Sequence, residues 1–457
     1  MNGPVLLRHG VQPRRTDGLD GGLPPVAPSQ REARGALEHL VVINDDCFES
    51  GGAASIALSG IRAMRQRGIK VTMLTGDATI NAELDNIGAS VVRLGGQHLL
   101  EGARAKAAMR GLFDPGTRHE LGHWIACNDT PGTIYHLHNW HKYLSPSVFL
   151  PLRRISHRLV FSQHDFFLVC PNGGFYDYPR AMPCERRPMS AACLLTACDK
   201  RSRAHKAWRV VRQSVRNHAI ELNNTSATIL AVHEGMRPLL ERGGIASERI
   251  RILRNPVTPW LQKRVDAAAN SDFLYVGRLD ADKGIDVLAR AARLAGVRLR
   301  VVGDGPLAPW LADTHPEIEL LGRLPSRAIA EVAVTARCVV VPTIVRETFG
   351  LVAMEALTSG IPVIITDTAF IAREVVEAGM GLTCRSGDVA SLAAQISNVA
   401  RDDELADALS RAAHAVAPAS CLTIESWSEE LLRIYCECLD RTSQPLRDVV
   451  QRGVVET

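Results

Sequence analysis

Two successive runs of alternating strands and helices constrain the fold of this chain more than any other feature. The first run opens with the apolar segment 40–43, a glycine-bearing turn at 49–52 and a helical pattern over 53–67. A strand, a glycine turn and a helix in this order open a βαβ unit. Further strands of this run are expected at 70–74, 90–94, 133–137, 158–162, 227–232 and 250–253.

A proline-marked break at Asn255-Pro256 separates the first run from the second. Two runs of this kind predict the α/β class, with two doubly wound parallel sheets. Ligands of such sheets bind at the carboxyl ends of the strands, so the cleft between the two sheets is the expected site. The second run is expected to hold strands at 273–276, 299–302, 318–321, 338–341 and 362–365, a helix at 285–294 and a final amphipathic helix at 426–439.

The expected domains follow from where the alternation starts, breaks and ends. Residues 1–37 are rich in Gly, Pro, Arg and Asp without apolar periodicity, which is typical of a flexible tail. The other expected units are an N-terminal domain at 38–255 with a cysteine-containing insertion at 165–200, a linker at 256–270, a C-terminal domain at 271–420, and a closing helix and tail at 421–457.

Composition and charge exclude several classes of protein. Of 457 residues, 46% are hydrophobic and 22% are charged, which rules out a wholly disordered chain. The 53 basic and 49 acidic residues leave a net charge of +4, too small for a dedicated nucleic-acid binder. No segment approaches the ~20 apolar residues of a membrane span, and the apolar run 5–7 is too short for a signal peptide. Eleven scattered cysteines, an odd number, indicate reduced thiols, so we expect a cytoplasmic protein.

Two cations follow the first strand of the second run. Arg278 comes directly after the strand, and Lys283 precedes Gly284 at the start of a helix. Helix amides and the positive end of the helix dipole favour a phosphate at this place, and Arg and Lys add full charges. The pattern therefore fits a diphosphate, although two solvated loop cations would give the same sequence.

Two acids follow a later strand of the same run. Glu347 lies in the loop after the strand, and Glu355 lies eight positions further, inside the next helix. Gly350 between them allows a ligand to approach the backbone closely at the helix start. The two carboxylates could accept hydrogen bonds from a ribose and a sugar, but acids near a helix N-terminus are also common for dipole reasons alone.

Together these residues resemble the retaining glycosyltransferases of family 4. Members have the GT-B fold, in which two Rossmann-like domains face a cleft. The resemblance covers roughly residues 40–440 and is more specific in the second run than in the first. It also rests on Gly303-Asp304-Gly305-Pro306, Met354-Glu355-Ala356, Gly360-Ile361-Pro362-Val363-Ile364, Glu374, Ser386-Gly387-Asp388, Arg242-Gly243-Gly244-Ile245, Glu248-Arg249-Ile250 and Asn255.

The resemblance implies a role for each matched residue. Arg278 and Lys283 match the pair that holds the donor diphosphate, Glu355 the acid that binds the nucleotide ribose, and Glu347 the acid that faces the donor sugar. The backbone around Phe349, Gly350 and Leu351 matches the contacts to phosphate and sugar, and Gly51-Gly52 matches the glycine turn that approaches the diphosphate from the N-terminal domain.

A histidine pair ends the strand at 133–137. His136 and His138 share one face, and a His-x-His pair could bind a metal, although no third ligand is evident nearby. His138 matches the cleft histidine of the family that meets the donor sugar, whereas a structural role fits His136 better. We therefore expect catalytic roles for His138 and Glu347.

Four cysteines fall in or beside the insertion. His164-Asp165 followed by this cysteine-containing segment looks like a sub-group that acts in exopolysaccharide assembly. The irregular spacing leaves structural zinc and unpaired thiols as equal alternatives, with a disulfide less favoured. The cysteines are Cys170, Cys184, Cys193 and Cys198.

Two charged segments have a plain and a functional interpretation. Seven cations between Lys200 and Arg216 could be a solvated helix face or a contact with an anionic membrane or a lipid-linked acceptor.

Asp280-Ala281-Asp282 fits the Asp-x-Asp pattern of metal-dependent transferases, but it lies between the two phosphate-binding cations. We interpret it as a polar turn and expect catalysis to need no metal or other cofactor.

The segment Thr368-Ala369-Phe370 departs from the family, which has glycines there, and Asn255-Pro256 replaces its usual Asn-Gly.

The resulting hypothesis is retaining transfer of a sugar from a UDP- or GDP-linked donor to a glycan or lipid-linked acceptor at the inner face of a membrane. A phosphorylase or epimerase of the same fold, and a non-catalytic nucleotide-sugar-binding subunit, remain alternatives. A nicotinamide dehydrogenase is disfavoured because neither run carries a Gly-x-Gly-x-x-Gly turn with a suitably spaced acid.

Overall fold

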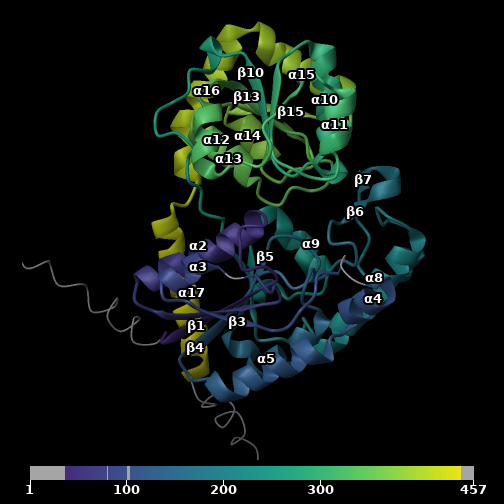
Figure 1. The fold of residues 1–457 in the computed structure, drawn as a ribbon, viewed down its shortest axis with the longest axis vertical. Helices are drawn as coiled ribbons and strands as arrows, with labels where there is room; N and C mark the ends of the chain where they lie inside the picture. The colour runs from purple at the N-terminus through teal and green to yellow at the C-terminus, as the bar shows by residue number, and fades with distance from the viewer. Residues whose placement is uncertain (1–36, 80, 100–102, 444–457) are drawn as a thin grey trace, which may run out of the picture.

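The computed structural model describes residues 37–79, 81–99 and 103–443, which form two α/β units with one main sheet each (Figure 1). This arrangement is the expected one. Each unit has a twisted parallel sheet flanked by helices, and the carboxyl ends of the strands in one unit face the other unit. Within the described residues, no helix is both long enough and apolar enough to cross a membrane.

The N-terminal sheet has seven parallel strands in the order β3-β2-β1-β4-β5-β8-β9. Its central strands are buried along their whole length, which is why they read as short unbroken apolar runs. The strands are β1 (His39–Asn44), β2 (Lys70–Thr75), β3 (Ser90–Arg93), β4 (Thr133–Leu137), β5 (Leu159–Gln163), β8 (Thr228–Ala231) and β9 (Ile250–Ile252), and the helices are α2 (Gly52–Gln66), α3 (Ala82–Asn86), α4 (Arg104–Leu112), α5 (Pro115–Asn128), α6 (Phe149–Leu152), α8 (Arg203–Ala219) and α9 (Arg237–Arg242).

The C-terminal sheet has six parallel strands in the order β12-β11-β10-β13-β14-β15. Its edge strand β15 (Gly381–Cys384) was not expected, because four residues with only one large apolar side chain carry almost no pattern. The other strands are β10 (Asp272–Val276), β11 (Leu299–Val302), β12 (Glu319–Leu320), β13 (Ala336–Val341) and β14 (Val363–Thr366), and the helices are α10 (Ile285–Ala295), α11 (Ala308–Thr314), α12 (Ser326–Ala333), α13 (Leu351–Thr358), α14 (Ala372–Glu377), α15 (Val389–Arg401) and α16 (Asp403–Val416).

The insertion lies at one side of the molecule, where the two units meet (Figure 1). It holds the hairpin β6 (Tyr176–Asp177) and β7 (Met182–Pro183) and the short helix α7 (Ala191–Leu195). Glu185 of this segment forms an ion pair of 2.5 Å with Arg346 of the C-terminal unit. Lys200 lies 3.4 Å from Asp282 in the turn after β10. The insertion therefore ties the N-terminal unit to the loops that carry the expected donor site.

The last helix, α17 (Ile424–Ser443), returns to the N-terminal unit, where it runs along α2 and β4 (Figure 1). The ring of Trp427 covers Gly60, where a β-carbon would lie 3.4 Å from it. The hydroxyl of Tyr435 lies 2.6 Å from Nδ1 of His136. The chain thus crosses between the units twice, and its final helix completes the N-terminal core.

Candidate active site between the two sheets

Lys283 and Glu347 meet where two neighbouring strands end. Lys283 follows β10, Glu347 follows β13, and Nζ of the lysine lies 2.7 Å from Oε2 of the glutamate. The turns pack tightly because Gly284 has φ 70° and a β-carbon there would lie 2.0 Å from the carbonyl oxygen of Pro342. A glycine is therefore required for the lysine loop to touch the glutamate loop.

Glu347 is held in its ionised form. Burial alone would raise the pKa of its carboxyl group. The charge of Lys283 and hydrogen bonds from Lys283, Thr343 and the amide of Gly350 outweigh burial and lower the pKa. The result is a fixed carboxylate beside a fixed ammonium group at the carboxyl end of the sheet.

The expected glycine turn of the N-terminal unit faces this loop. Gly350 adopts φ 74° immediately before α13, and the N-terminal end of α2 follows Gly51. A β-carbon on Gly52 would lie 3.1 Å from Cδ1 of Leu351. Two helix N-termini, one from each unit, therefore approach each other, with the buried ring of Phe349 beside them.

Arg278 and the Asp-x-Asp segment lie in the turn after β10. The Arg278 side chain is 60% exposed, and its Nη1 lies 2.5 Å from Oδ2 of Asp280. Asp282 instead pairs with Lys200 of the insertion. The two aspartates thus neutralise neighbouring cations, as a polar turn would. In the part of the chain that the structure describes, no group of three or more His, Cys, Asp or Glu side chains is arranged to hold a metal ion.

Glu355 lies on α13, one helix turn beyond the loop. Burial raises the pKa of its carboxyl group to about 7, and a hydrogen bond from Trp260 offsets part of the shift. Trp260 belongs to the linker and was not expected at the site, because nothing in the sequence marks an aromatic residue of a linker as a partner of a helix acid.

Three histidines stack at the carboxyl ends of β4 and β5. The rings of His136 and His138 are 4.1 Å apart, and those of His138 and His164 are 5.4 Å apart and nearly parallel. Nδ1 of His138 lies 3.1 Å from Nε2 of His164. The other ring nitrogen of His138, Nε2, takes no part in this hydrogen bond. His136 is occupied by Ser162 and Tyr435, which fits the structural role expected for it.

The histidine stack is uncharged at neutral pH. Burial lowers the pKa of His138 well below its usual range, and the neighbouring His136 and His164 lower it further. Burial also lowers the pKa of His164 to about 4. His164 is tied to the glutamate loop because Thr348 Oγ1 donates a hydrogen bond of 2.9 Å to its carbonyl oxygen. His164 was expected only as a marker of the sub-group, not as part of the site.

Asp45 shapes the segment that follows the histidines. Its carboxylate accepts hydrogen bonds of 2.7–2.9 Å from four successive backbone amides. Burial raises its pKa, and three of these amide hydrogen bonds oppose that rise. The sequence analysis missed this residue, since a single aspartate after a strand gives no sign of its partners almost 100 residues away. The amides belong to His141, Lys142, Tyr143 and Leu144.

The four cysteines of the insertion are all buried, and none forms a disulfide. Lys206 reaches into this group, with Nζ 3.3 Å from Sγ of Cys198 and 3.6 Å from Sγ of Cys193. Arg186 approaches Cys184, and Asn172 contacts Cys170 and Cys198. Within the described residues these cysteines form no group arranged to hold a metal ion, so the geometry gives the predicted structural zinc no support.

The basic segment between Lys200 and Arg216 is not one exposed face. Lys206, Arg212 and Arg216 are buried. The guanidinium group of Arg212 lies over the rings of Trp140 and Trp208, at 5.1 and 5.4 Å from their centres. Neither a solvated helix face nor a membrane contact, the two alternatives for this segment, fits these three residues, because their charged groups are buried in the N-terminal unit.

Comparison with known proteins shows a family likeness in the C-terminal unit. Residues 270–402 match the family model described as glycosyl transferases group 1. This segment is similar to a glycosyl transferases group 1 domain. It contains β10 to β15 and therefore carries Arg278, Lys283, Glu347 and Glu355.

Relatives extend the likeness beyond this domain. A glycogen synthase of Mycobacterium tuberculosis is 29% identical over 227 residues, which is 46% of this chain and 54% of the relative. The chain thus spans about half the length of that curated relative. Sucrose-phosphate synthase from Thermosynechococcus elongatus superposes with a TM-score of 0.65 at 18% identity, over 88% of this chain and all of the other. HepE from Anabaena, solved in complex with UDP-glucose, gives a TM-score of 0.59 at 17% identity, over 88% and 99% of the two chains. The fold is GT-B, with two α/β units and parallel sheets.

The departure at Thr368-Ala369-Phe370 has a structural role. Phe370 of the C-terminal unit contacts the N-terminal unit, where its ring stacks on His233 at 5.7 Å. A β-carbon on Gly235 would lie 2.5 Å from the Phe370 ring. His233 also lies 2.8 Å from Glu374. The aromatic residue therefore joins the two units at a point where the family has glycines.

Proposed function

We propose that the chain is a retaining glycosyltransferase that moves a sugar from a nucleotide-diphosphate donor to an acceptor hydroxyl group. The observation that carries this proposal is the Lys283–Glu347 pair, placed at adjacent strand ends opposite the glycine turn at Gly51-Gly52. A cation, a carboxylate and two helix N-termini around one cleft suit a ligand with a diphosphate and a polyol. The match of residues 270–402 to the glycosyl transferases group 1 model supports the same proposal.

The leaving diphosphate is stabilised by charges that are already in place. Cleavage of the anomeric bond leaves negative charge on the diphosphate and positive charge on the sugar ring. Arg278, Lys283 and the amides at the start of α13 neutralise the diphosphate. Arg278 now pairs with Asp280, so the donor replaces this weak surface pair with a more highly charged partner. These groups supply the neutralising charge from the protein itself, so we propose a metal-independent reaction.

Glu347 and His138 orient the sugar on the other side of the bond. The carboxylate of Glu347 accepts hydrogen bonds from sugar hydroxyl groups. Because His138 is neutral, it can bond to a hydroxyl group without placing a second positive charge beside the developing cation. Front-face attack by the acceptor, with the leaving phosphate taking its proton, then gives retention of configuration. Domain closure over the donor excludes water.

The nucleotide base and the acceptor are assigned by class. HepE, which has a similar fold, was solved with UDP-glucose bound, and this supports a UDP-linked sugar as the donor. A GDP-linked sugar is the alternative. The His164-Asp165 segment and the cysteine-containing insertion support a role in exopolysaccharide or another cell-surface glycan, with a glycan or lipid-linked acceptor on the cytoplasmic side of a membrane.

Donor binding and stereochemistry test the proposal directly. We would screen UDP-, GDP- and ADP-sugars by thermal shift in EDTA, where ligand at 100 times its dissociation constant adds about 2.7 kcal/mol to the folded state. Proton NMR of the sugar released from the stabilising donor then reports its anomeric configuration before mutarotation. Stabilisation by one nucleotide class and a retained configuration are expected. An inverted configuration contradicts the retaining mechanism, and donor binding with neither transfer nor hydrolysis favours a non-catalytic binding subunit.

A further inference from the structure

Helices α4 and α8 form one surface on the side of the N-terminal unit away from α17 (Figure 1). Nε1 of Trp208 on α8 donates a hydrogen bond of 3.0 Å to the carbonyl oxygen of Ala108 on α4. A β-carbon on Gly111 would lie 2.8 Å from the Trp208 ring, so α4 can approach α8 only because this residue is glycine. We call the outer faces of these two helices the α4–α8 surface.

The α4–α8 surface is positively charged. Neither 103–113 nor 200–219 contains an aspartate or glutamate. Among the residues that the structure describes, the nearest exposed acids along the chain are Glu120 on α5 and Glu221 after α8. The exposed cations on these two helices or next to them along the chain are Arg104, Lys106, Lys200, Arg201 and Arg203.

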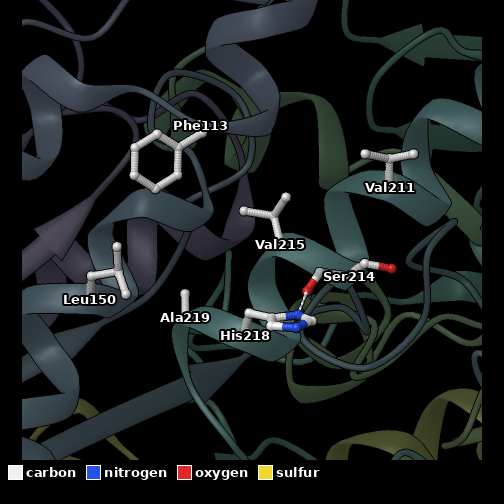
Figure 2. Close-up of a pocket in the computed structure, with 7 residues that line it drawn as sticks. All are labelled: Phe113, Leu150, Val211, Ser214, Val215, His218 and Ala219. Atoms are coloured by element: carbon white, nitrogen blue, oxygen red, sulfur yellow. Dashed lines mark hydrogen bonds between the residues drawn. The ribbon is translucent and has the colours of Figure 1, made fainter.

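Apolar side chains are exposed between these cations. Met109 on α4 is 66% exposed and Val211 on α8 is 49% exposed. Beside them an open groove of about 410 Å³ runs between α8 and the segments that carry Phe113 and Leu150 (Figure 2). Figure 2 shows Val215, Ser214 and His218 of α8 along one wall, with the His218 ring bonded back to the carbonyl of Ser214. The groove is therefore mostly apolar at a place where the surrounding surface is basic.

The inner face of α8 holds this surface rigid. Arg209 lies 3.0 Å from Asp199 and donates to the carbonyl oxygen of Asn172. Arg212 donates to the carbonyl oxygen of His141. Because these inner cations are occupied, the outer residues are presented by a fixed helix and pay little ordering cost on binding.

We propose that the α4–α8 surface docks on a bilayer containing anionic lipid. Exposed methionine and valine beside an apolar groove can enter the boundary between headgroups and acyl chains, while the surrounding cations meet the headgroup charge. Two helices without acidic residues, with apolar residues between their cations, match the anionic headgroups and the apolar acyl chains of such a bilayer. This inference does not depend on the proposed sugar transfer.

Vesicle co-sedimentation of the full chain tests the proposal. We would compare vesicles of phosphatidylcholine alone with vesicles of phosphatidylcholine and 30% phosphatidylglycerol, at 50 and 300 mM NaCl. The wild type is expected to bind the anionic vesicles at least tenfold more tightly, with the preference reduced at high salt. Equal binding to both vesicle types, or no binding to either, overturns the proposal.

Two variants separate charge from apolar contact. The double variant Arg104→Glu/Lys106→Glu should lose at least tenfold in affinity for anionic vesicles. Its matched control is Arg290→Glu/Arg411→Glu, which makes the same charge change at exposed positions of α10 and α16 and should bind as the wild type does. Val211→Glu should also lose binding, whereas Leu294→Glu, at a 71% exposed apolar position of α10, should not.

Each variant must melt cooperatively at the wild-type temperature, which shows that the fold is intact. Equal losses in the α4–α8 variants and their controls overturn the proposal, because net charge alone then explains binding. Light scattering provides one further outcome. A concentration-dependent dimer that Val211→Glu abolishes, without lipid binding by the wild type, assigns the surface to a second copy of the chain and overturns the proposal as well.

Discussion

The two sides of the cleft solve the problem of burying polar groups in opposite ways. On the C-terminal side, Lys283 and Glu347 are both charged and satisfy each other at 2.7 Å. On the N-terminal side, His138 and His164 are both neutral and satisfy each other through one hydrogen bond of 3.1 Å. Burial of a charge is tolerated only with a partner, whereas a titratable ring without a carboxylate partner loses its proton.

The difference separates two tasks. The C-terminal side offers fixed charge, which a diphosphate needs, and the N-terminal side offers hydrogen bonds without charge, which suits sugar hydroxyl groups. Substitutions in the ion pair should therefore have larger effects than substitutions in the histidine stack.

The largest effect is expected from Glu347→Gln. Loss of a carboxylate that faces the reacting sugar should lower kcat for donor hydrolysis by about 10²–10³-fold. Donor affinity should stay the same or rise, because Lys283 is then free for the diphosphate. UDP release and donor titration measure the two quantities, and Glu377→Gln at an exposed ion pair of α14 is the control. Wild-type turnover in Glu347→Gln would contradict the role of the fixed carboxylate on the C-terminal side of the cleft.

The next effect is expected from Lys283→Gln. A charge-assisted hydrogen bond contributes about 1.5–3 kcal/mol, so the donor dissociation constant should rise about 10- to 100-fold. Calorimetric titration with the preferred donor measures this change. Lys263→Gln, at an exposed lysine of the linker, should leave the constant unchanged. Equal affinities for Lys283→Gln and wild type would place the diphosphate elsewhere.

Glu355→Gln should weaken donor binding and raise the stability of the free protein. The pKa of Glu355 is raised to about 7 in the folded chain, so ionisation above that pH costs folding free energy. The cost is complete above pH 7 and disappears below the unfolded pKa near 4.5. The amide should therefore stabilise the free protein by about 1–3 kcal/mol at pH 8 and not at pH 4. Thermal melts at both pH values measure this, and equal gains at the two pH values would contradict a buried carboxylate.

The smallest effect is expected from the histidine stack. His164→Phe removes the partner of His138 Nδ1 and should lower kcat about fivefold, the value of one neutral hydrogen bond. His164→Gln keeps a polar group near the same position and should recover most of the activity. Identical losses in the two variants would show that the ring of His164 matters for packing rather than for the orientation of His138.

The two sides also differ in how far the sequence predicts them. Arg278, Lys283, Gly350 and Glu355 follow strands closely enough that local pattern places them at one sheet edge. The Lys283–Glu347 contact follows from the parallel pairing of β10 and β13, which the alternation of elements implies. The glycines Gly52 and Gly284 are likewise marked by their position beside a strand or helix start.

The contacts of the N-terminal side depend on tertiary packing that no local pattern encodes. Tyr435 reaches His136 from 299 residues away. The C-terminal side has such a contact as well, because Trp260 reaches Glu355 from the linker. The basic segment shows the same limit, because the cations of α8 divide between a buried and an exposed face according to what packs against the helix. Helical periodicity alone could not separate Arg212, which lies between two tryptophan rings, from Arg203 on the outside.

A crystal structure with UDP, grown in the presence of EDTA, tests the division of tasks most directly. We expect the diphosphate within hydrogen-bond distance of Lys283 and the amides at the start of α13, the ribose on Glu355, and no metal ion between phosphate and protein. Nε2 of His138 should border the space where the sugar would lie. A nucleotide bound away from Lys283, or a diphosphate held only through a cation on Asp280 and Asp282, would contradict it.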